Sequence, residues 1–320
     1  MGRRKTLGAA PKGPVGIVAT SRAATQEIIC LLVRDEVGVS QTIEVNSKGK
    51  GTALSVGLQT LQADPATSVI ILASGSISPT AITQTLATMG NCDKPTIACL
   101  LGSDPRSIWK AGAIPAARLD EAAMRAAAWA RGWDQALVSS SLEDQNEQLA
   151  GMARQLQPRF TPARCRIYGL FTDEVLGYEA QLMLSDLAKK SGDARLESAL
   201  EVCVQSDFTQ WQPRLHQALG DPLAAVVLLD LMCSSDRAGD PVSVLAAALE
   251  EHRRLERHPR GGHAGEPCIV ARLFRPGGDP RALASDEARL WDADVILAPS
   301  NAAMARLAGM IVEELCRPTL

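Results

Sequence analysis

The sequence is poor in aromatic residues and has no excess of positive charge. Phe, Trp and Tyr together make up 3% of the chain, and 33 Lys and Arg residues against 36 Asp and Glu residues leave a formal net charge of -3. No general basic field is therefore available to hold a polyanion. We expect no nucleic acid partner.

Long apolar segments, signal sequences and cysteine motifs are also missing. No stretch approaches the roughly 18 apolar residues that cross a bilayer, and the basic start (Arg3, Arg4, Lys5) is not followed by the apolar core of a signal peptide. The eight cysteines form no Cys-x-x-Cys pair and have no histidine at ligand spacing, so we predict no metal site. They are typical of small buried side chains in a reducing compartment. These absences favour a cytoplasmic protein with a short solvated leader, residues 1–13.

Short apolar runs of strand length recur through the first half of the chain. They are rich in β-branched residues and lie at residues 15–18, 42–45, 68–73 and 96–101. Between them, residues 26–34 and 52–61 carry apolar residues three and four apart, which is typical of amphipathic helices. Apolar strands that alternate with helices indicate a parallel sheet covered on both faces. We therefore predict an α/β fold of the doubly wound class.

The same order of elements returns in the second half. Apolar runs occur at residues 166–171, 200–204, 224–231 and 268–274, with helical segments at residues 176–189 and 213–219. Asp-Pro pairs repeat as well: Asp64-Pro65 and Asp221-Pro222 precede the third run of each half, and Asp104-Pro105 and Asp279-Pro280 follow the fourth. Asp-Pro is a turn and helix-start signal. We predict two tandem five-stranded flavodoxin-like domains, residues 14–131 and 164–320.

Two polar stretches separate or interrupt these domains. Residues 132–163 are predicted to be a linker, helix-prone in part, in which Ser141 and Asp144 could cap a helix. Residues 252–267 are basic and rich in glycine, which is typical of a solvated loop.

Ligands of a doubly wound sheet bind at the carboxyl ends of its strands, where helix amino termini offer free amides to anions. After the first strand, Thr20, Ser21, Arg22 and Thr25 lead into a helix. Ser21 can cap that helix, and all four side chains could also contact an anion. No glycine lets the backbone close around a phosphate, so the capped helix start is favoured over the anion site.

The corresponding loop of the second domain carries two carboxylates, Asp173 and Glu174. They suit a helix start themselves and would repel a phosphate, so we predict that this loop binds none. An acid/base pair is the alternative, but adjacent carboxylates at a helix start are usually caps.

Other candidates are weaker. After the second strand, Asn46, Ser47 and Lys48, followed by a second lysine and two glycines, could hold an anion or form a flexible turn. Ser139 to Ser141 and His216 show no nucleophile-base spacing, and a solvated turn and a helix-face histidine account for them.

Taken in order, these features resemble the FdrA family of acyl-CoA synthetase-like proteins over residues 14–315. In the first half, the resemblance rests on residues 15–18, Gln26-Glu27, Asp64-Pro65, residues 68–73, Lys94-Pro95-Thr96 and residues 119–123. In the second half, it rests on Gly169-Leu170, Glu179-Ala180, residues 226–230, Gly278-Asp279-Pro280 and Ser300-Asn301-Ala302. The family is related to succinyl-CoA synthetase and to nucleoside-diphosphate-forming acyl-CoA ligases. The resemblance therefore implies two succinyl-CoA synthetase-like domains.

The chain departs from the family pattern at the loops that cradle anions. Where family members carry Ser-Gly-Thr-Gly, Gly-Gly-Arg-Asp and Gly-Gly-Thr loops, this chain has Ser21-Arg22-Ala23, residues 46–49 and residues 173–175. Residues 262–265 read Gly-His-Ala-Gly, like the phosphohistidine loop of succinyl-CoA synthetases, but they precede the strand at residues 268–274 instead of following it. That order favours a surface loop.

One family member is a subunit of the oxamate carbamoyltransferase of purine (allantoin) breakdown, which works with two further subunits and a carbamate kinase. The resemblance implies a comparable complex subunit with protein partners and a small anionic substrate, contacted at most through Ser21, Arg22 and Lys48. The altered loops favour a structural, pseudoenzyme-like role. The alternative is an active acyl-CoA ligase subunit, but its cofactors, CoA or a nucleotide, are disfavoured. If active, the chain would belong to a transferase or an acid-thiol ligase.

Overall fold

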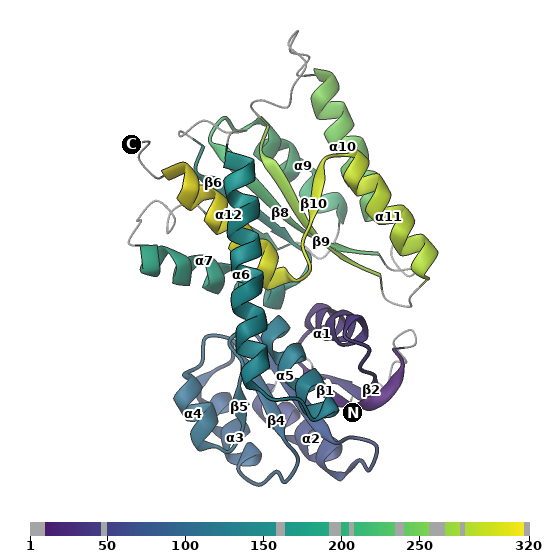
Figure 1. Ribbon diagram of the computed structural model, residues 1–320, viewed down its shortest axis with the longest axis vertical. Coiled ribbons are helices and arrows are strands. Elements are labelled where there is room, and N and C mark those ends of the chain that lie inside the picture. The colour runs from purple at the N-terminus through teal and green to yellow at the C-terminus, as the bar shows by residue number, and fades with distance from the viewer. Residues whose placement is uncertain are drawn as a thin grey trace. The chain divides into compact units, whose positions relative to one another are not determined.

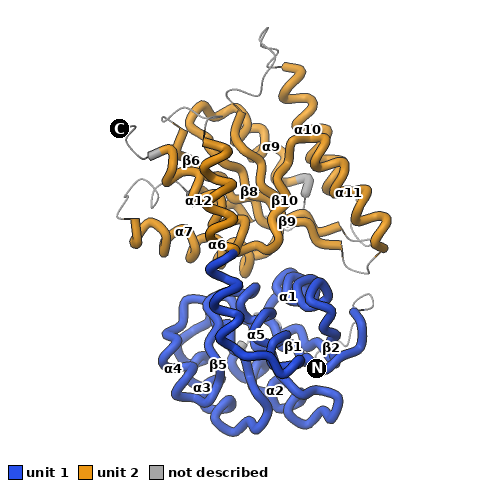
Figure 2. Tube along the Cα trace, in the orientation of Figure 1, with its two compact units in different colours: residues 1–144 blue, residues 145–320 orange. Residues whose placement is uncertain are grey.

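The computed structural model describes residues 10–45, 50–157, 164–191, 200–204, 208–233, 240–255, 266–275 and 279–316. The chain divides into two compact units, Met1–Asp144 (unit 1) and Gln145–Leu320 (unit 2), shown in Figure 2. Each unit contains one five-stranded parallel sheet. The predicted α/β class with two tandem doubly wound domains is confirmed.

The sheet of unit 1 has the flavodoxin-like strand order β2-β1-β3-β4-β5. Its strands are β1 (Lys12–Ala19), β2 (Val39–Glu44), β3 (Val69–Ser74), β4 (Thr96–Leu100) and β5 (Ile114–Pro115). Its helices are α1 (Arg22–Arg34), α2 (Lys50–Ala63), α3 (Pro79–Met89), α4 (Pro105–Lys110) and α5 (Leu119–Arg131). α1 packs with α5 and α2 with α3, on opposite faces of the sheet (Figure 1).

The central strand β3 is apolar without interruption because both of its faces are covered by helices. All six of its residues are buried. Ile70 and Leu72 pack with Leu54 and Leu58 of α2, and because side chains of a strand alternate between faces, the intervening residues point toward the other helix layer. A strand covered on both faces needs apolar residues at every position.

Unit 2 repeats this topology. Its sheet order is β10-β9-β8-β6-β7. Read from the β7 edge, these are the second, first, third, fourth and fifth strands of the unit, as in unit 1. The strands are β6 (Arg166–Phe171), β7 (Leu200–Val204), β8 (Ala224–Met232), β9 (Cys268–Phe274) and β10 (Val295–Leu297). The helices are α7 (Glu174–Ser191), α9 (Phe208–Gly220), α10 (Pro241–Leu255), α11 (Pro280–Asp292) and α12 (Asn301–Cys316). α7 packs with α12, and α10 packs with α9 and α11.

A single helix, α6 (Ala136–Leu156), occupies most of the segment predicted to be a linker. Its first turns pack through Val138 and Leu142 on unit 1, and Leu149 further along is also buried. The predicted cap at Ser141 and Asp144 is wrong, because Asp134 already accepts the amide of Ala136 at 2.9 Å and starts the helix earlier. Ser139 to Ser141 therefore lie within a helix and not in a turn.

The Asp-Pro pairs behave as predicted. Asp104 and Asp279 are the N-caps of α4 and α11, each followed by proline in the first turn. Other boundaries differ from the prediction, among them that of β2, which spans Val39–Glu44 where residues 42–45 were predicted. β1 begins at Lys12, inside the predicted leader, and α10 continues to Leu255, so the start of the predicted loop at residues 252–267 is helical.

Candidate functional site

The first strand-to-helix corner of unit 1 is closed by its own side chains. Ser21 is the N-cap of α1, and its Oγ accepts the amide of Ala24 at 2.9 Å. The fully buried Thr25 donates its hydroxyl to the Ser21 carbonyl oxygen at 2.9 Å. The predicted capped helix start is confirmed. Ser21 thus takes an amide that an anion would otherwise contact.

Thr20 joins this corner to the neighbouring strand. Its Oγ1 donates to Ser74 Oγ, at the end of β3, at 3.3 Å, and accepts the amide of Gly75 at 3.4 Å. β1 and β3 are adjacent at the point where the strand order reverses, which is where doubly wound sheets bind ligands. Thr20, Ser21 and Thr25 are therefore brought together, and Arg22 is exposed beside them.

The other predicted anion contacts cannot be placed. Asn46, Ser47 and Lys48 lie outside the described residues. They follow β2, which ends at Glu44 beside β1.

The equivalent corner of unit 2 carries two carboxylates. Asp173 Oδ1 accepts the amide of Val175 at 2.8 Å, so it caps α7 as predicted, and the exposed Glu174 is the first residue of that helix. Asp230 in β8 was not predicted as a site residue. Its two carboxyl oxygens accept the Thr172 amide at 2.6 Å and the Thr172 hydroxyl at 2.7 Å.

The carboxyl group of Asp230 is fully buried. Its pKa is raised to about 8: burial is the main cause, the neighbouring Asp173 also raises it, and the two hydrogen bonds from Thr172 lower it. The sequence signal for this residue was one acidic residue inside an otherwise apolar strand.

The two corners correspond residue by residue. Each begins with a threonine, Thr20 or Thr172, that binds a polar side chain of the third strand, and continues with a capping residue, Ser21 or Asp173. In both units the protein itself supplies the acceptor at the helix amino terminus. In unit 2 that acceptor is a carboxylate, which also repels anions.

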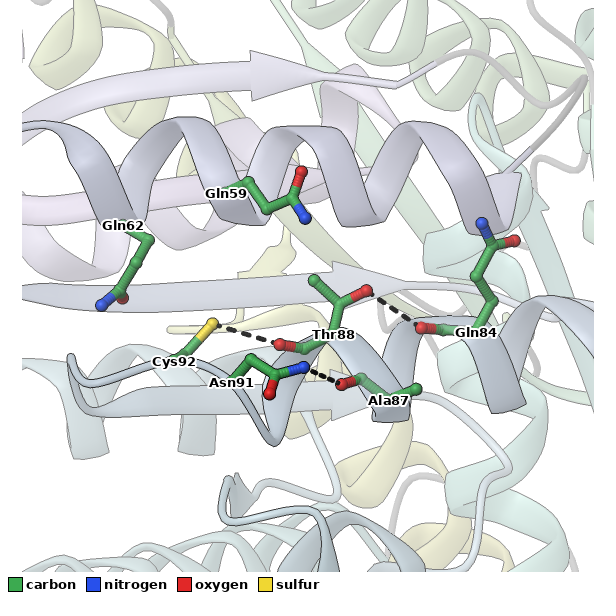
Figure 3. A pocket seen from close by; sticks show the side chains of 7 residues that line it. All are labelled: Gln59, Gln62, Gln84, Ala87, Thr88, Asn91 and Cys92. Atoms are coloured by element: carbon green, nitrogen blue, oxygen red, sulfur yellow. Dashed lines mark hydrogen bonds between the residues drawn. The ribbon is translucent and has the colours of Figure 1, made fainter.

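A pocket of about 320 Å³ lies elsewhere in unit 1, between α2 and α3 (Figure 3). It is lined by Gln59, Gln62, Gln84, Ala87, Thr88, Asn91 and Cys92. Asn91 and Cys92 follow the end of α3, so this groove opens toward the amino ends of the strands, opposite to the corner of Thr20. None of the predicted site residues lines it.

Side chains that line this pocket form hydrogen bonds with neighbouring residues. Asn91 Nδ2 donates to the Ala87 carbonyl at 3.0 Å, and Gln84 Nε2 donates to Thr52 Oγ1 at 3.1 Å. Burial, together with Asp93, raises the pKa of the Cys92 thiol. A thiol with a raised pKa is a poor nucleophile. The pocket therefore offers neutral hydrogen-bonding groups and no activated residue.

The remaining candidates are His216, the Gly-His-Ala-Gly segment and the cysteines. His216 is exposed on α9, as predicted for a helix-face histidine, and the Gly-His-Ala-Gly segment lies outside the described residues. Cys99, Cys233 and Cys268 are buried, and burial, with Asp286, raises the pKa of Cys233 to about 12. Among the residues that the structure describes, no three His, Cys, Asp or Glu side chains are grouped to bind a metal. In the same residues, no helix combines the length and apolar character needed to cross a bilayer.

Comparison with known proteins gave structural similarities only. No protein-family model and no curated protein matches the chain. An acetyl-coenzyme A synthetase from Ca. Korarchaeum cryptofilum, solved with phosphate and ADP, is 14% identical with a TM-score of 0.32 over 98% of this chain and 67% of its own. A carbohydrate transporter from Acidothermus cellulolyticus, solved with myo-inositol, is 10% identical with a TM-score of 0.42 over 95% of this chain and 86% of its own.

An ATP citrate lyase from Methanosaeta concilii is 10% identical, with a TM-score of 0.33 over 96% of this chain and 50% of its own. The similar structures thus include acyl-CoA ligase-like enzymes together with a sugar-binding transport protein. These similarities assign no function.

Proposed function

We propose that this chain is a structural subunit of an FdrA-type multiprotein complex, carbamoyltransferase-like and active in the breakdown of oxamate or oxalurate from purine or allantoin nitrogen. The proposal rests on the sequence resemblance and on one structural observation. In both first corners a side chain of the protein, Ser21 or Asp173, accepts one amide at the helix amino terminus, and Arg22 and Ala23 stand where the family loop has glycine and threonine. Architecture of the acyl-CoA ligase type is kept while the anion cradle is replaced.

A residual substrate contact belongs to this proposal. Arg22 is exposed at the corner of unit 1, beside the hydroxyl groups of Thr20 and Ser21. An exposed guanidinium can pair with a carboxylate or carbamate that is held mainly by another subunit. We propose that Arg22, with Lys48, makes the chain's contribution to a shared anion site.

The competing proposal is an active acyl-CoA ligase subunit, which needs CoA or a nucleotide. Titration calorimetry of the isolated chain with CoA, ADP and phosphate separates the two. We expect no binding tighter than about 0.1 mM, which corresponds to about -5.5 kcal/mol. Tighter binding of CoA or ADP would favour the ligase.

Copurification tests the complex itself. The tagged chain, expressed with the products of its neighbouring genes, should retain transferase subunits and a carbamate kinase. Retention of no partner would contradict the proposal. Within the assembled complex, Arg22→Ala should raise the KM for the anionic substrate about tenfold, whereas Arg154→Ala, an exposed arginine of α6, should leave it unchanged. Equal KM values for the two variants would exclude the contact through Arg22.

A further inference from the structure

The turn before the last strand of each sheet has the same pattern and conformation in both units. Residues 109–114 read Trp-Lys-Ala-Gly-Ala-Ile, and residues 291–296 read Trp-Asp-Ala-Asp-Val-Ile. The fourth residue has a positive φ in both, 80° at Gly112 and 58° at Asp294. Its amide donates to the tryptophan carbonyl oxygen at 3.0 Å in unit 1 and 2.9 Å in unit 2. Trp109 and Trp291 therefore occupy equivalent positions.

Both indoles face solvent although neither is needed for the core. Trp109 is 68% exposed and Trp291 is 71% exposed. The residue before each one, Ile108 or Leu290, is buried and anchors its helix to the sheet. Tryptophan is highly buried on average in folded proteins. Trp109 and Trp291 are the two most exposed of the five tryptophans and occupy one repeated position, which favours a surface used in binding.

The charges that flank the two indoles are opposite. Arg106, one helical turn earlier, and Lys110 flank Trp109, and all three are exposed; we term them the basic face. Glu287, four residues before Trp291, and Asp292, directly after it, are also exposed and form the acidic face with Trp291. Lys110 and Asp292 are equivalent in the repeat, so the two faces carry opposite charges at this position.

Other ionised groups close to the two faces act within their own unit. Asp104 caps α4 through the Arg106 amide at 3.1 Å. Arg289 of α11 donates to Asp240 Oδ2 at 2.9 Å. Asp104 and Arg289 are therefore engaged within their own units.

We infer that the basic face of one copy of this chain binds the acidic face of a second copy. Two basic faces, or two acidic faces, would repel each other, whereas a basic and an acidic face attract and bury two indoles. Each copy carries one basic and one acidic face, so two copies can make two such contacts. If both form within one pair of copies, the result is a closed dimer; if they form with different copies, a larger assembly results. The inference is independent of the proposed function.

Charge reversal tests the contact. Light scattering after size-exclusion chromatography should show wild-type assembly between about 1 and 100 µM. Lys110→Asp and Asp292→Lys should each raise the Kd of assembly at least about tenfold, and the double variant should return it to within about threefold of wild type. Trp109→Ala and Trp291→Ala should also raise the Kd about tenfold.

Two variants outside the faces serve as controls. Trp129→Ala removes another exposed indole, and Glu250→Lys reverses another exposed charge, so neither should change the Kd. A wild-type chain that stays monomeric throughout the range would overturn the inference. So would a double variant that assembles no better than the single variants, since the pairing of Lys110 with Asp292 would then be absent.

Discussion

At the scale of single residues, the buried carboxyl group of Asp230 makes the stability of unit 2 depend on pH. Its pKa in the folded chain is about 8, above the value of 3.8 for an unperturbed aspartate. Between these values the folded chain holds a proton that the unfolded chain releases, so the free energy of unfolding falls as pH rises. The steepest slope is about 1.4 kcal/mol per pH unit for one proton.

Replacing this carboxyl group should remove that slope. Asp230→Asn should unfold in denaturant with a free energy that varies less between pH 4.5 and 8.5 than that of wild type, because the amide does not titrate. Glu250→Gln, at an exposed position of α10, should keep the wild-type dependence. An unchanged slope in Asp230→Asn would show that another group carries it.

The cap at Ser21 gives a second residue-scale prediction. Ser21→Ala leaves the Ala24 amide without its acceptor, so it should lower the free energy of unfolding of unit 1 by about 1 kcal/mol in urea denaturation. Ser21→Asp should be close to wild type, since Asp173 caps α7 with the same group. Ser141→Ala, at an exposed position inside α6, should cost nothing. A loss as large at Ser141 would argue against the capping role.

Caps were predictable from sequence because they are local. Ser21, Asp104 and Asp279 each accept an amide two or three residues ahead, so the information lies within one turn of chain. The bonds of Asp230 span 58 positions to Thr172. Its role depends on β6 and β8 being neighbours, which no local pattern encodes.

At the scale of elements, the positive φ at Gly112 sets the turn into β5. Gly112→Ala should destabilise unit 1 by about 1 kcal/mol, measured by denaturant unfolding, because an L side chain disfavours this conformation even where space is free. Gly90→Ala is the matched control, since Gly90 has a helical φ of -60°. An equal loss of stability in both variants would mean that the added methyl group, and not the positive φ of Gly112, causes the destabilisation.

Sequence analysis gave no range for several elements, among them the two short strands β5 and β10 and the long helix α12. β5 has two residues and β10 has three, which is too short for a hydrophobic pattern. The polar sequence of residues 132–163 suggested a linker, but α6 needs only a narrow apolar stripe, in which Val138, Leu142 and Leu149 are buried. The buried strands β3 and β8 were found because each is a nearly continuous apolar run.

At the scale of the whole molecule, intrinsic fluorescence should report mainly on unit 2. Of the five tryptophans, Trp211 is 1% exposed, whereas the other four are 44% to 71% exposed. Only a buried indole changes its surroundings greatly on unfolding. Trp211→Phe should abolish most of the red shift of emission in denaturant, and Trp129→Phe should not. A red shift retained by Trp211→Phe would mean that another tryptophan is buried in the folded chain.

The tandem repeat was predictable from the sequence, whereas the boundary between the units was not. Repeated Asp-Pro pairs mark the same strand in each half, as at Asp64 and Asp221. The division after Asp144 falls within α6, and nothing in the local sequence of that helix distinguishes one unit from the next.

The capping of both corners by Ser21 and Asp173 also affects a search for ligands of this chain by thermal unfolding. A ligand raises the melting temperature only to the extent that it prefers the native state to the unfolded one. Since Ser21 and Asp173 each already accept one amide of their helix start, small anions should leave the thermal midpoint of the isolated chain unchanged. A small anion that did raise this midpoint would favour the acyl-CoA ligase alternative.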